Sequence, residues 1–186
     1  MPQLAQHLKW TYEDFLLFPD DGKRHELIDG EHIMSPSPIT KHQRILLNIA
    51  RIISNFLKSH RIGEVFIAPM DVVLSDFDVV EPDLLFIASP HASIITKKHI
   101  MGVPDLVVEI LSVSSRKTDE IIKRRLYEQY GVQEYWIVDP ELDSVKMYRI
   151  EGGGYVKVAE LSVEAGDSLT TPCLPTLTIA LSEIFE

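Results

Sequence analysis

Three apolar runs of strand length, with one helical segment between the second and the third, constrain the fold of this chain more than any other feature. The runs span residues 79–87, 104–112 and 134–140, and the helical segment spans 116–130. Two neighbouring parallel strands need a crossover connection of about this length. We therefore predict buried neighbouring strands joined by a helix, within an α/β fold.

Acidic residues interrupt two of these apolar runs. Side chains alternate between the two faces of a strand, and in the segment 105–111 both faces are mostly apolar, so the strand is expected to be covered on both sides. Glu109 then occupies a position where an ionised carboxylate is costly unless it is paired, hydrogen-bonded or bound to a metal. Asp83 poses the same question in the preceding run, where the continuous apolar part begins after Pro82. Two acids at the ends of adjacent strands would converge, and a divalent cation is one way to stabilise both.

The helical segment brings a lysine towards these acids. With Thr118 as the expected N-cap, the side chains at every fourth position predict the stripe that faces the core. Lys123 lies in the row beside that stripe, and its long stem can carry the ammonium to the strand ends. Metal-dependent phosphodiester hydrolysis uses this set of residues. Acids hold the cation, and the cation lowers the pKa of bound water. A lysine orients the water or stabilises the phosphorane oxygens. The expected core stripe is Ile122, Leu126 and Tyr130, and the row beside it is Asp119, Lys123 and Tyr127.

These residues and their surroundings resemble the Uma2 family, also known as DUF820. The likeness rests on Pro-Asp at 82–83, Glu-Ile-Leu-Ser at 109–112, Lys123 in the next element, and Gly-Val-Gln-Glu-Tyr-Trp-Ile-Val-Asp-Pro at 131–140. It extends over nearly the whole chain, including His-Glu-Leu-Ile-Asp-Gly-Glu at 25–31. The family belongs to the PD-(D/E)XK nuclease superfamily, so the resemblance implies a restriction-endonuclease-like core with a mixed central β-sheet flanked by helices.

The resemblance also implies a metal site. Mg²⁺, or Mn²⁺ in its place, would be held by Asp83, Glu109 and the backbone carbonyl of Ile110. Glu26 would be an accessory acid. The superfamily lysine stands two residues after the strand acid, and Leu111 occupies that place here. Family members of this kind use a lysine on the following helix instead, which Lys123 matches.

The length of 186 residues predicts a single domain over 1–186. Its core is expected at about 38–140, with a long helix at about 40–59. An N-terminal helix, which a capping-box pattern at Thr11 opens, and a hairpin with an Asp-Gly turn precede the core at 11–34. A C-terminal β extension, which begins with a hairpin around three glycines, follows at 141–186.

The formal net charge of −10 argues against a general polyanion binder, because nonspecific nucleic-acid affinity comes mainly from Lys and Arg. Five basic residues nevertheless lie within 116–125. Either they form a solvated helix face or they contact phosphate. The chain contains no Walker loop, nucleophile elbow or CxxC pair, which argues against the enzyme classes that those motifs mark.

The remaining features indicate where the protein works. A single cysteine, Cys173, excludes an intramolecular disulfide and fits a reducing compartment. Residues 1–16 lack the basic and apolar parts of a signal peptide, and no apolar run approaches the roughly 18 residues of a membrane span. We expect a cytoplasmic protein without a membrane partner. The resemblance implies a possible homodimer, since cutting two strands takes two sites.

Several polar residues allow two interpretations. Glu26 is either an exposed strand residue or the accessory acid. His42, in the first turn of the long helix, is expected to be solvated, the alternative being a place at the rim of the cleft. Asp71 and Asp78 are expected to be turn or edge acids. The connector 88–103 is expected to be a mobile segment near the site.

Three functions remain open at this point. The first is a metal-dependent endonuclease that hydrolyses phosphodiester bonds in nucleic acid, with DNA as the expected partner. The second is a catalytically degenerate relative that binds nucleic acid or protein, which Leu111 and the acidic total favour. The third takes Glu109 and Lys123 as a buried ion pair without chemistry.

Overall fold

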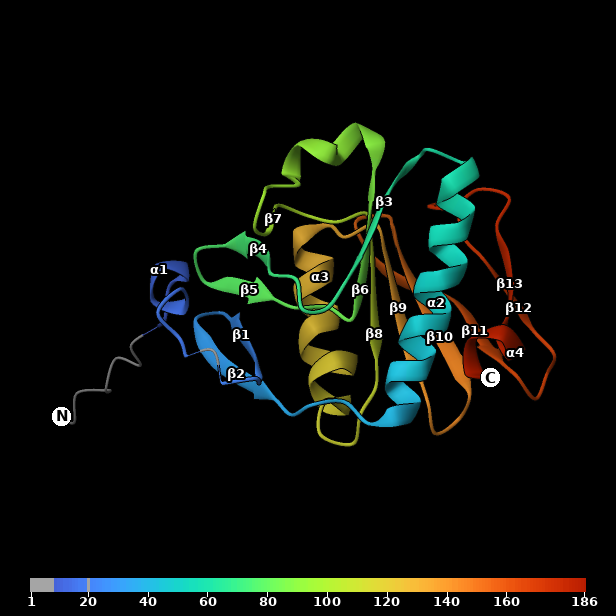
Figure 1. Ribbon diagram of the computed structural model, residues 1–186, viewed down its shortest axis with the longest axis horizontal. Helices are drawn as coiled ribbons and strands as arrows, with labels where there is room; N and C mark the ends of the chain where they lie inside the picture. Colours follow the sequence, from blue (N-terminus) through green and yellow to red (C-terminus); the bar gives the residue numbers. More distant parts are fainter. Residues whose placement is uncertain (1–8, 20) are drawn as a thin grey trace.

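Three β-sheets, of six, five and two strands, and the helices that pack on them make up the computed structural model, which describes residues 9–19 and 21–186 (Figure 1). Residues 1–8 of the segment inspected for a signal peptide therefore lie outside the described part. The main sheet has six strands in the order β11-β10-β9-β8-β6-β3. Their bounds are β3 Gly63–Ile67, β6 Leu84–Ala88, β8 Leu106–Ile110, β9 Glu134–Asp139, β10 Ser144–Glu151 and β11 Gly154–Ser162.

The centre of the main sheet confirms the predicted crossover. Strands β8 and β9 pair in parallel, and the helical segment between them packs on the sheet. Strand β6 runs antiparallel to β8, with Leu84 opposite Val108. Because of this direction, the start of β6 lies beside the end of β8. Asp83 and Glu109, one residue beyond that pair on each strand, are therefore neighbours.

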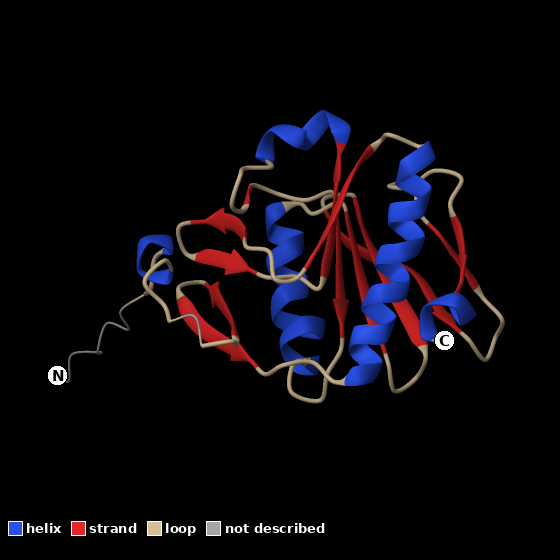
Figure 2. Cartoon of the chain, viewed as in Figure 1, coloured by secondary structure: helices blue, strands red, loops and turns tan. Residues whose placement is uncertain are grey.

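Helices cover both faces of this sheet (Figure 2). On one face α2, Thr40–Ser59, packs with the short C-terminal α4, Leu181–Phe185, over alternate residues of β8 that include Val108. On the other face α3, Arg124–Tyr130, packs over the remaining residues, which include Val107. The expectation that this strand is covered on both sides is confirmed, and Glu109 is only 1% exposed.

A second, five-stranded sheet has the order β2-β1-β5-β4-β7. The apolar run at 79–87 is divided between the two sheets, since β5 ends at Val80 and β6 begins at Leu84. Pro82 lies in the break, where a residue without an N–H cannot continue a ladder. Residues 63–75 are divided in the same way into β3 and β4, with Pro69 between them. The strands are β1 Arg24–Ile28, β2 Glu31–Ser35, β4 Val72–Ser75, β5 Asp78–Val80 and β7 Ile100–Met101.

The ends of the chain match their predictions closely. At the N-terminal end, Thr11 caps helix α1, Tyr12–Phe15, through the expected capping box. The hairpin of β1 and β2 turns at Asp29 and Gly30. At the C-terminal end, β10 and β11 form the predicted hairpin and extend the main sheet, while β12, Ser168–Thr170, pairs with β13, Thr178–Ala180.

The crossover helix departs from its prediction. Thr118 is not an N-cap, because helical backbone already begins before it and the segment η2, Thr118–Lys123, is a π-helix. The i→i+5 pattern of such a turn changes which residues of the segment face the sheet. Ile122, expected in the core, is 39% exposed, whereas Lys123 is 3% exposed. The polar row of Asp119, Lys123 and Tyr127 is the buried one.

The connector 88–103 also differs from its prediction. It contains regular structure, namely the 3₁₀ helix η1, Ser89–Ile94, and strand β7, which pairs with β4. His91 of η1 contacts Asp105 at 2.8 Å, just before the start of β8 and therefore at the other end of the strand from Glu109. The connector thus does not border the acid pair. Within the described residues no helix is both long and apolar enough to cross a membrane.

Candidate active site

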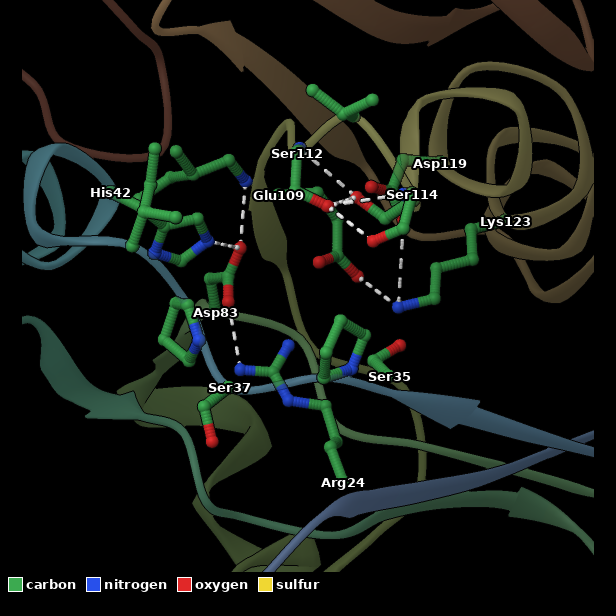
Figure 3. Close-up of a pocket in the computed structure, with 16 residues that line it drawn as sticks. Arg24, Ser35, Ser37, His42, Asp83, Glu109, Ser112, Ser114, Asp119 and Lys123 are labelled. Carbon is green, nitrogen blue, oxygen red and sulfur yellow. Dashed lines mark hydrogen bonds and ion pairs between the residues drawn. The ribbon is translucent and has the colours of Figure 1, made fainter.

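A cavity of about 290 Å³ opens where β6 begins and β8 ends (Figure 3). Three acids, Asp83, Glu109 and Asp119, line it together with two cations, Arg24 and Lys123. Its outer walls are two loops rich in serine and proline, at 35–39 and 112–115. The structure therefore brings together the two strand acids and the helix lysine that the sequence singled out.

Glu109 lies at the floor of this cavity. Its Oε1 accepts hydrogen bonds from Lys123 Nζ at 3.0 Å and from the Tyr127 hydroxyl at 2.8 Å. Figure 3 shows its other carboxylate oxygen turned to the side of Asp83. Burial raises the pKa of Glu109 to about 8, with Lys123 opposing the rise and the neighbouring acids adding to it. One oxygen of this carboxylate is thus engaged, and the other faces the cavity.

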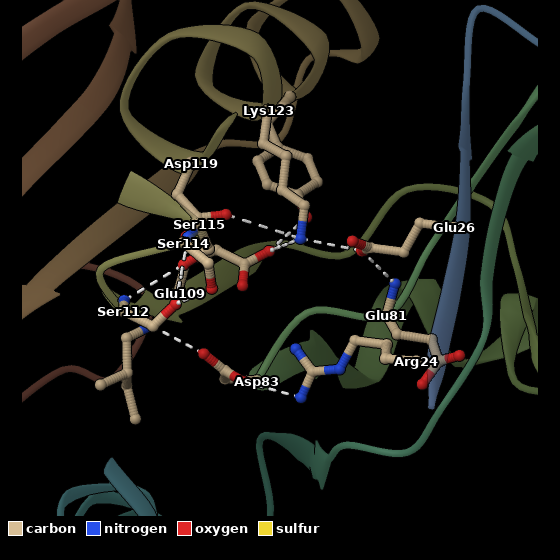
Figure 4. A network of polar contacts seen from close by, with 12 residues as sticks. Arg24, Glu26, Glu81, Asp83, Glu109, Ser112, Ser114, Ser115, Asp119 and Lys123 are labelled. Atoms are coloured by element: carbon tan, nitrogen blue, oxygen red, sulfur yellow. Dashed lines mark hydrogen bonds and ion pairs between the residues drawn. The ribbon is translucent and has the colours of Figure 1, made fainter. Parts of the chain in front are cut away.

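Lys123 lies between carboxylates from three elements (Figure 4). Its Nζ is 2.8 Å from Glu26, 3.0 Å from Glu109 and 3.7 Å from Asp119. Burial lowers the pKa of Lys123, but these acids raise it well above its ordinary value. The side chain is therefore a permanent ammonium whose donors point at carboxylates. Its first effect is to hold Glu109 in place.

Asp83 is held by donors on both of its oxygens. Arg24 donates to Oδ1 at 2.9 Å, while His42 Nε2 at 3.1 Å and the Ile110 N–H at 2.8 Å reach Oδ2. Burial raises the pKa of Asp83, but these contacts outweigh burial and keep that pKa below its ordinary value. Asp83 is thus a fixed, ionised carboxylate beside Glu109.

His42 is buried, contrary to the expectation that it is solvated. It is 5% exposed because the first turn of α2 packs against the start of β6, and it lines the cavity. The alternative, a place at the rim of the cleft, was nearer to the observed position.

The contact between His42 and Asp83 leads to a prediction. We expect His42→Ala to lower the free energy of unfolding by about 1–3 kcal/mol, because it leaves a buried carboxylate with fewer donors. Urea titration of the purified protein measures the change. His60→Ala, at the exposed C-terminal end of the same helix, is the control. Equal stability of the two variants would contradict the role of His42.

Glu26 is not an exposed strand residue, since it is 1% exposed on β1. Its carboxylate accepts the backbone N–H of Glu81 at 2.9 Å and pairs with Lys123. Figure 4 shows it on the opposite side of Lys123 from Glu109. An accessory role for Glu26 would therefore act through Lys123. Asp78, expected to be a turn acid, accepts hydrogen bonds from Ser75 and Tyr130 away from this cavity.

Two cavity residues were not singled out by the sequence as functional. Asp119 is 2% exposed, and burial raises its pKa to about 6. Only its spacing of four from Lys123 placed it in the same helical row. Arg24 begins β1, and nothing in its sequence neighbourhood indicated that its partner, Asp83, would come from 59 residues away.

The chemistry of this cluster fits a divalent cation. Five buried acids lie in and around the cavity against two cations, Arg24 and Lys123, so carboxyl groups outnumber cations. Among residues 9–19 and 21–186, no three acidic, histidine or cysteine side chains stand close enough to enclose an ion. Mg²⁺ typically binds one or two carboxylates and takes waters and substrate phosphates as its other ligands. The five acids are Glu26, Glu81, Asp83, Glu109 and Asp119.

Two of the five basic residues at 116–125, Arg116 and Lys123, are neutralised by ion pairs. Arg116 pairs with Asp139 at 2.7 Å and with Glu141 at 3.0 Å, and Lys123 is buried. Arg124 stacks over the ring of Tyr148 at 5.1 Å. Lys117 and Arg125 are exposed and form no ion pair within the described residues, so the segment keeps part of the positive charge that its composition suggests.

Comparisons with known proteins agree with this architecture. A model of the Uma2 family, described as "Putative restriction endonuclease", matches residues 12–182. A solved structure from Anabaena variabilis ATCC 29413, described as "a putative nuclease belonging to DUF820", superposes with a TM-score of 0.79. It is 23% identical, and the match covers 94% of this chain and 97% of that chain. No curated protein matches. The predicted fold class is confirmed.

Proposed function

The chain belongs to the Uma2 family, whose description is that of a restriction-endonuclease-like nuclease, and from this premise we propose that it is a metal-dependent endonuclease acting on DNA. One observation carries the proposal: Asp83, Glu109 and Lys123 meet in one cavity although they come from three separate elements. Mg²⁺ is the proposed ion, with Mn²⁺ as a substitute. The single cysteine supports a cytoplasmic location.

In the proposed reaction each residue has a separate task. Glu109 would hold the metal through its cavity-facing oxygen, and Asp83 and the Ile110 carbonyl would be the further ligands. The bound metal would lower the pKa of a water and neutralise charge that develops on the phosphate. Lys123 keeps Glu109 oriented and opposes its protonation, and Glu26 keeps Lys123 in position. A substrate phosphate would enter between the loops at 35–39 and 112–115.

The direct test is cleavage by the purified protein. We expect it to cut DNA when Mg²⁺ or Mn²⁺ is present and to stop when EDTA removes the metal. Parallel assays with RNA decide the substrate class, and size-exclusion chromatography with light scattering decides whether the proposed homodimer forms. Absence of cleavage on both nucleic acids with either metal would contradict the proposal.

A catalytically degenerate binding protein is the second candidate. Leu111 in the usual lysine position and the net charge of −10 favour it. Binding can be separated from cutting by comparing DNA retention in EDTA with turnover in Mg²⁺. Retention without turnover would favour this candidate.

Metal affinity should depend on pH. A divalent cation needs ionised carboxylates, and burial raises the pKa of Glu109 to about 8 and that of Asp119 to about 6. As pH rises from 6 to 8.5 these groups lose protons, so we expect Mg²⁺ to bind more tightly and to raise the melting temperature by a larger amount. Thermal unfolding with and without Mg²⁺ across this range measures the effect. A Mg²⁺-induced rise in melting temperature that stays the same across this pH range would contradict the predicted pH dependence.

A further inference from the structure

Arg24 differs from the other cation of the cavity in what it can still bind. Lys123 is 3% exposed and lies between carboxylates, whereas the Arg24 side chain is 20% exposed and lines the same cavity. Within the described part of the chain, the only hydrogen bond from the Arg24 guanidinium is from Nη2 to Asp83. A guanidinium has five N–H donors. Most of those of Arg24 therefore remain available.

The position of these donors matters as much as their number. Figure 3 shows the guanidinium with one nitrogen on Asp83 and another pointing up into the space between Asp83 and Lys123. The bond to Asp83 fixes the plane of the group, so the remaining donors are held in one orientation. Burial lowers the pKa of Arg24, but Asp83, Glu109 and Glu26 raise it well above its ordinary value, so the group stays charged.

We propose that Arg24 binds the non-bridging oxygens of the substrate phosphodiester, next to the proposed metal position. This inference rests on the proposed function and names a residue that contacts the reacting phosphate. An anionic substrate entering a cavity lined by three carboxylates is repelled unless a cation with free donors meets it. Arginine suits this task because its planar fork matches two phosphate oxygens at once. Asp83 then serves a second purpose, which is to orient Arg24.

A single phosphodiester without metal tests the contact directly. The dinucleotide dTpdT is titrated into the protein in EDTA, and NMR follows both the affinity and the Arg24 Nε–Hε resonance. We expect the resonance to shift, and Arg24→Gln to weaken binding by about tenfold, the equivalent of about 1.4 kcal/mol for a hydrogen bond to a charged group. The neutral methylphosphonate analogue should bind the wild type weakly, and its affinity for Arg24→Gln should be no lower.

The control is Arg51→Gln, the same substitution at an exposed position further along α2, which should leave dTpdT affinity unchanged. Thermal unfolding and Mg²⁺ binding of Arg24→Gln verify that the cavity survives the loss of the bond to Asp83. Equal dTpdT affinity in Arg24→Gln and wild type would overturn the inference, as would an equal loss for the neutral analogue. If the wild type cuts no nucleic acid with metal but Arg24→Gln still weakens dTpdT binding, the proposed function fails and the phosphate contact stands.

Discussion

Replacing Lys123 by alanine is expected to lower the free energy of unfolding by about 3–5 kcal/mol, because the change removes the cation from a buried cluster of acids. Glu26, Glu109 and Asp119 would be left within a few ångströms of one another without the ammonium that now lies 2.8–3.7 Å from each. Denaturant unfolding at neutral pH measures the loss. The stabilising contribution of Lys123 should persist at alkaline pH, since its raised pKa keeps it charged until the pH passes that value.

An exposed lysine provides the control for this experiment. Lys157 pairs with Glu160 on β11, with both side chains about half exposed, and solvent-exposed pairs contribute about 0–1 kcal/mol. Lys157→Ala should therefore cost far less than Lys123→Ala. If the two variants have the same stability, Lys123 does not carry the charge balance of the cluster. If Lys123→Ala is too unstable to purify, Lys123→Met combined with Glu109→Gln removes one cation and one acid together and should recover part of the loss.

Replacing Glu109 by glutamine should remove nuclease activity while the fold is kept. The amide oxygen can still accept hydrogen bonds from Lys123 and Tyr127, so we expect the free energy of unfolding to change by less than about 1.5 kcal/mol. A neutral amide is a much poorer ligand for Mg²⁺ than a carboxylate. Cleavage should fall by at least about 10²-fold, because a bound metal supplies several kcal/mol of charge stabilisation.

This pair of results separates a nuclease from a buried ion pair without chemistry. A stability loss in Lys123→Ala is expected whether or not the protein is an enzyme, since the ion pair exists in either case. Only Glu109→Gln distinguishes chemistry from ion pairing, because it keeps the hydrogen bonds and removes the metal ligand. Metal-dependent cleavage that survives this substitution would reject Glu109 as a ligand.

Much of the fold followed from local pattern. The capping box at Thr11, the Asp29-Gly30 turn and the hairpin after Ser144 are encoded by adjacent residues, and all three formed as expected. The division of residues 79–87 between two sheets was not predicted, because apolar character extends across the break and only Pro82 marks it. The connector 88–103 was misjudged since its weak periodicity hid a 3₁₀ helix.

The sequence indicated the site residue whose burial costs the most free energy, and it did not indicate the residues whose partners lie far away in the chain. Glu109 stood out because a carboxylate in an apolar strand requires a partner. His42 and Arg24 carry no such signal, since histidine and arginine at the start of a helix or strand are ordinary surface residues. Their burial depends on Asp83, which lies 41 and 59 residues further along the chain. Asp119 required knowledge of the helix register.

The π-helical turn at Thr118–Lys123 has a consequence for how this family can change. An α-helix advances by 3.6 residues per turn, so gaining or losing one residue within this turn would swing everything on one side of it by about 100°. Lys123 and Tyr127 could then no longer both reach Glu109. The serine-rich loop before the helix tolerates changes in length without this penalty. Relatives should therefore differ in the number of residues before position 116 and keep a constant count between the lysine and the tyrosine.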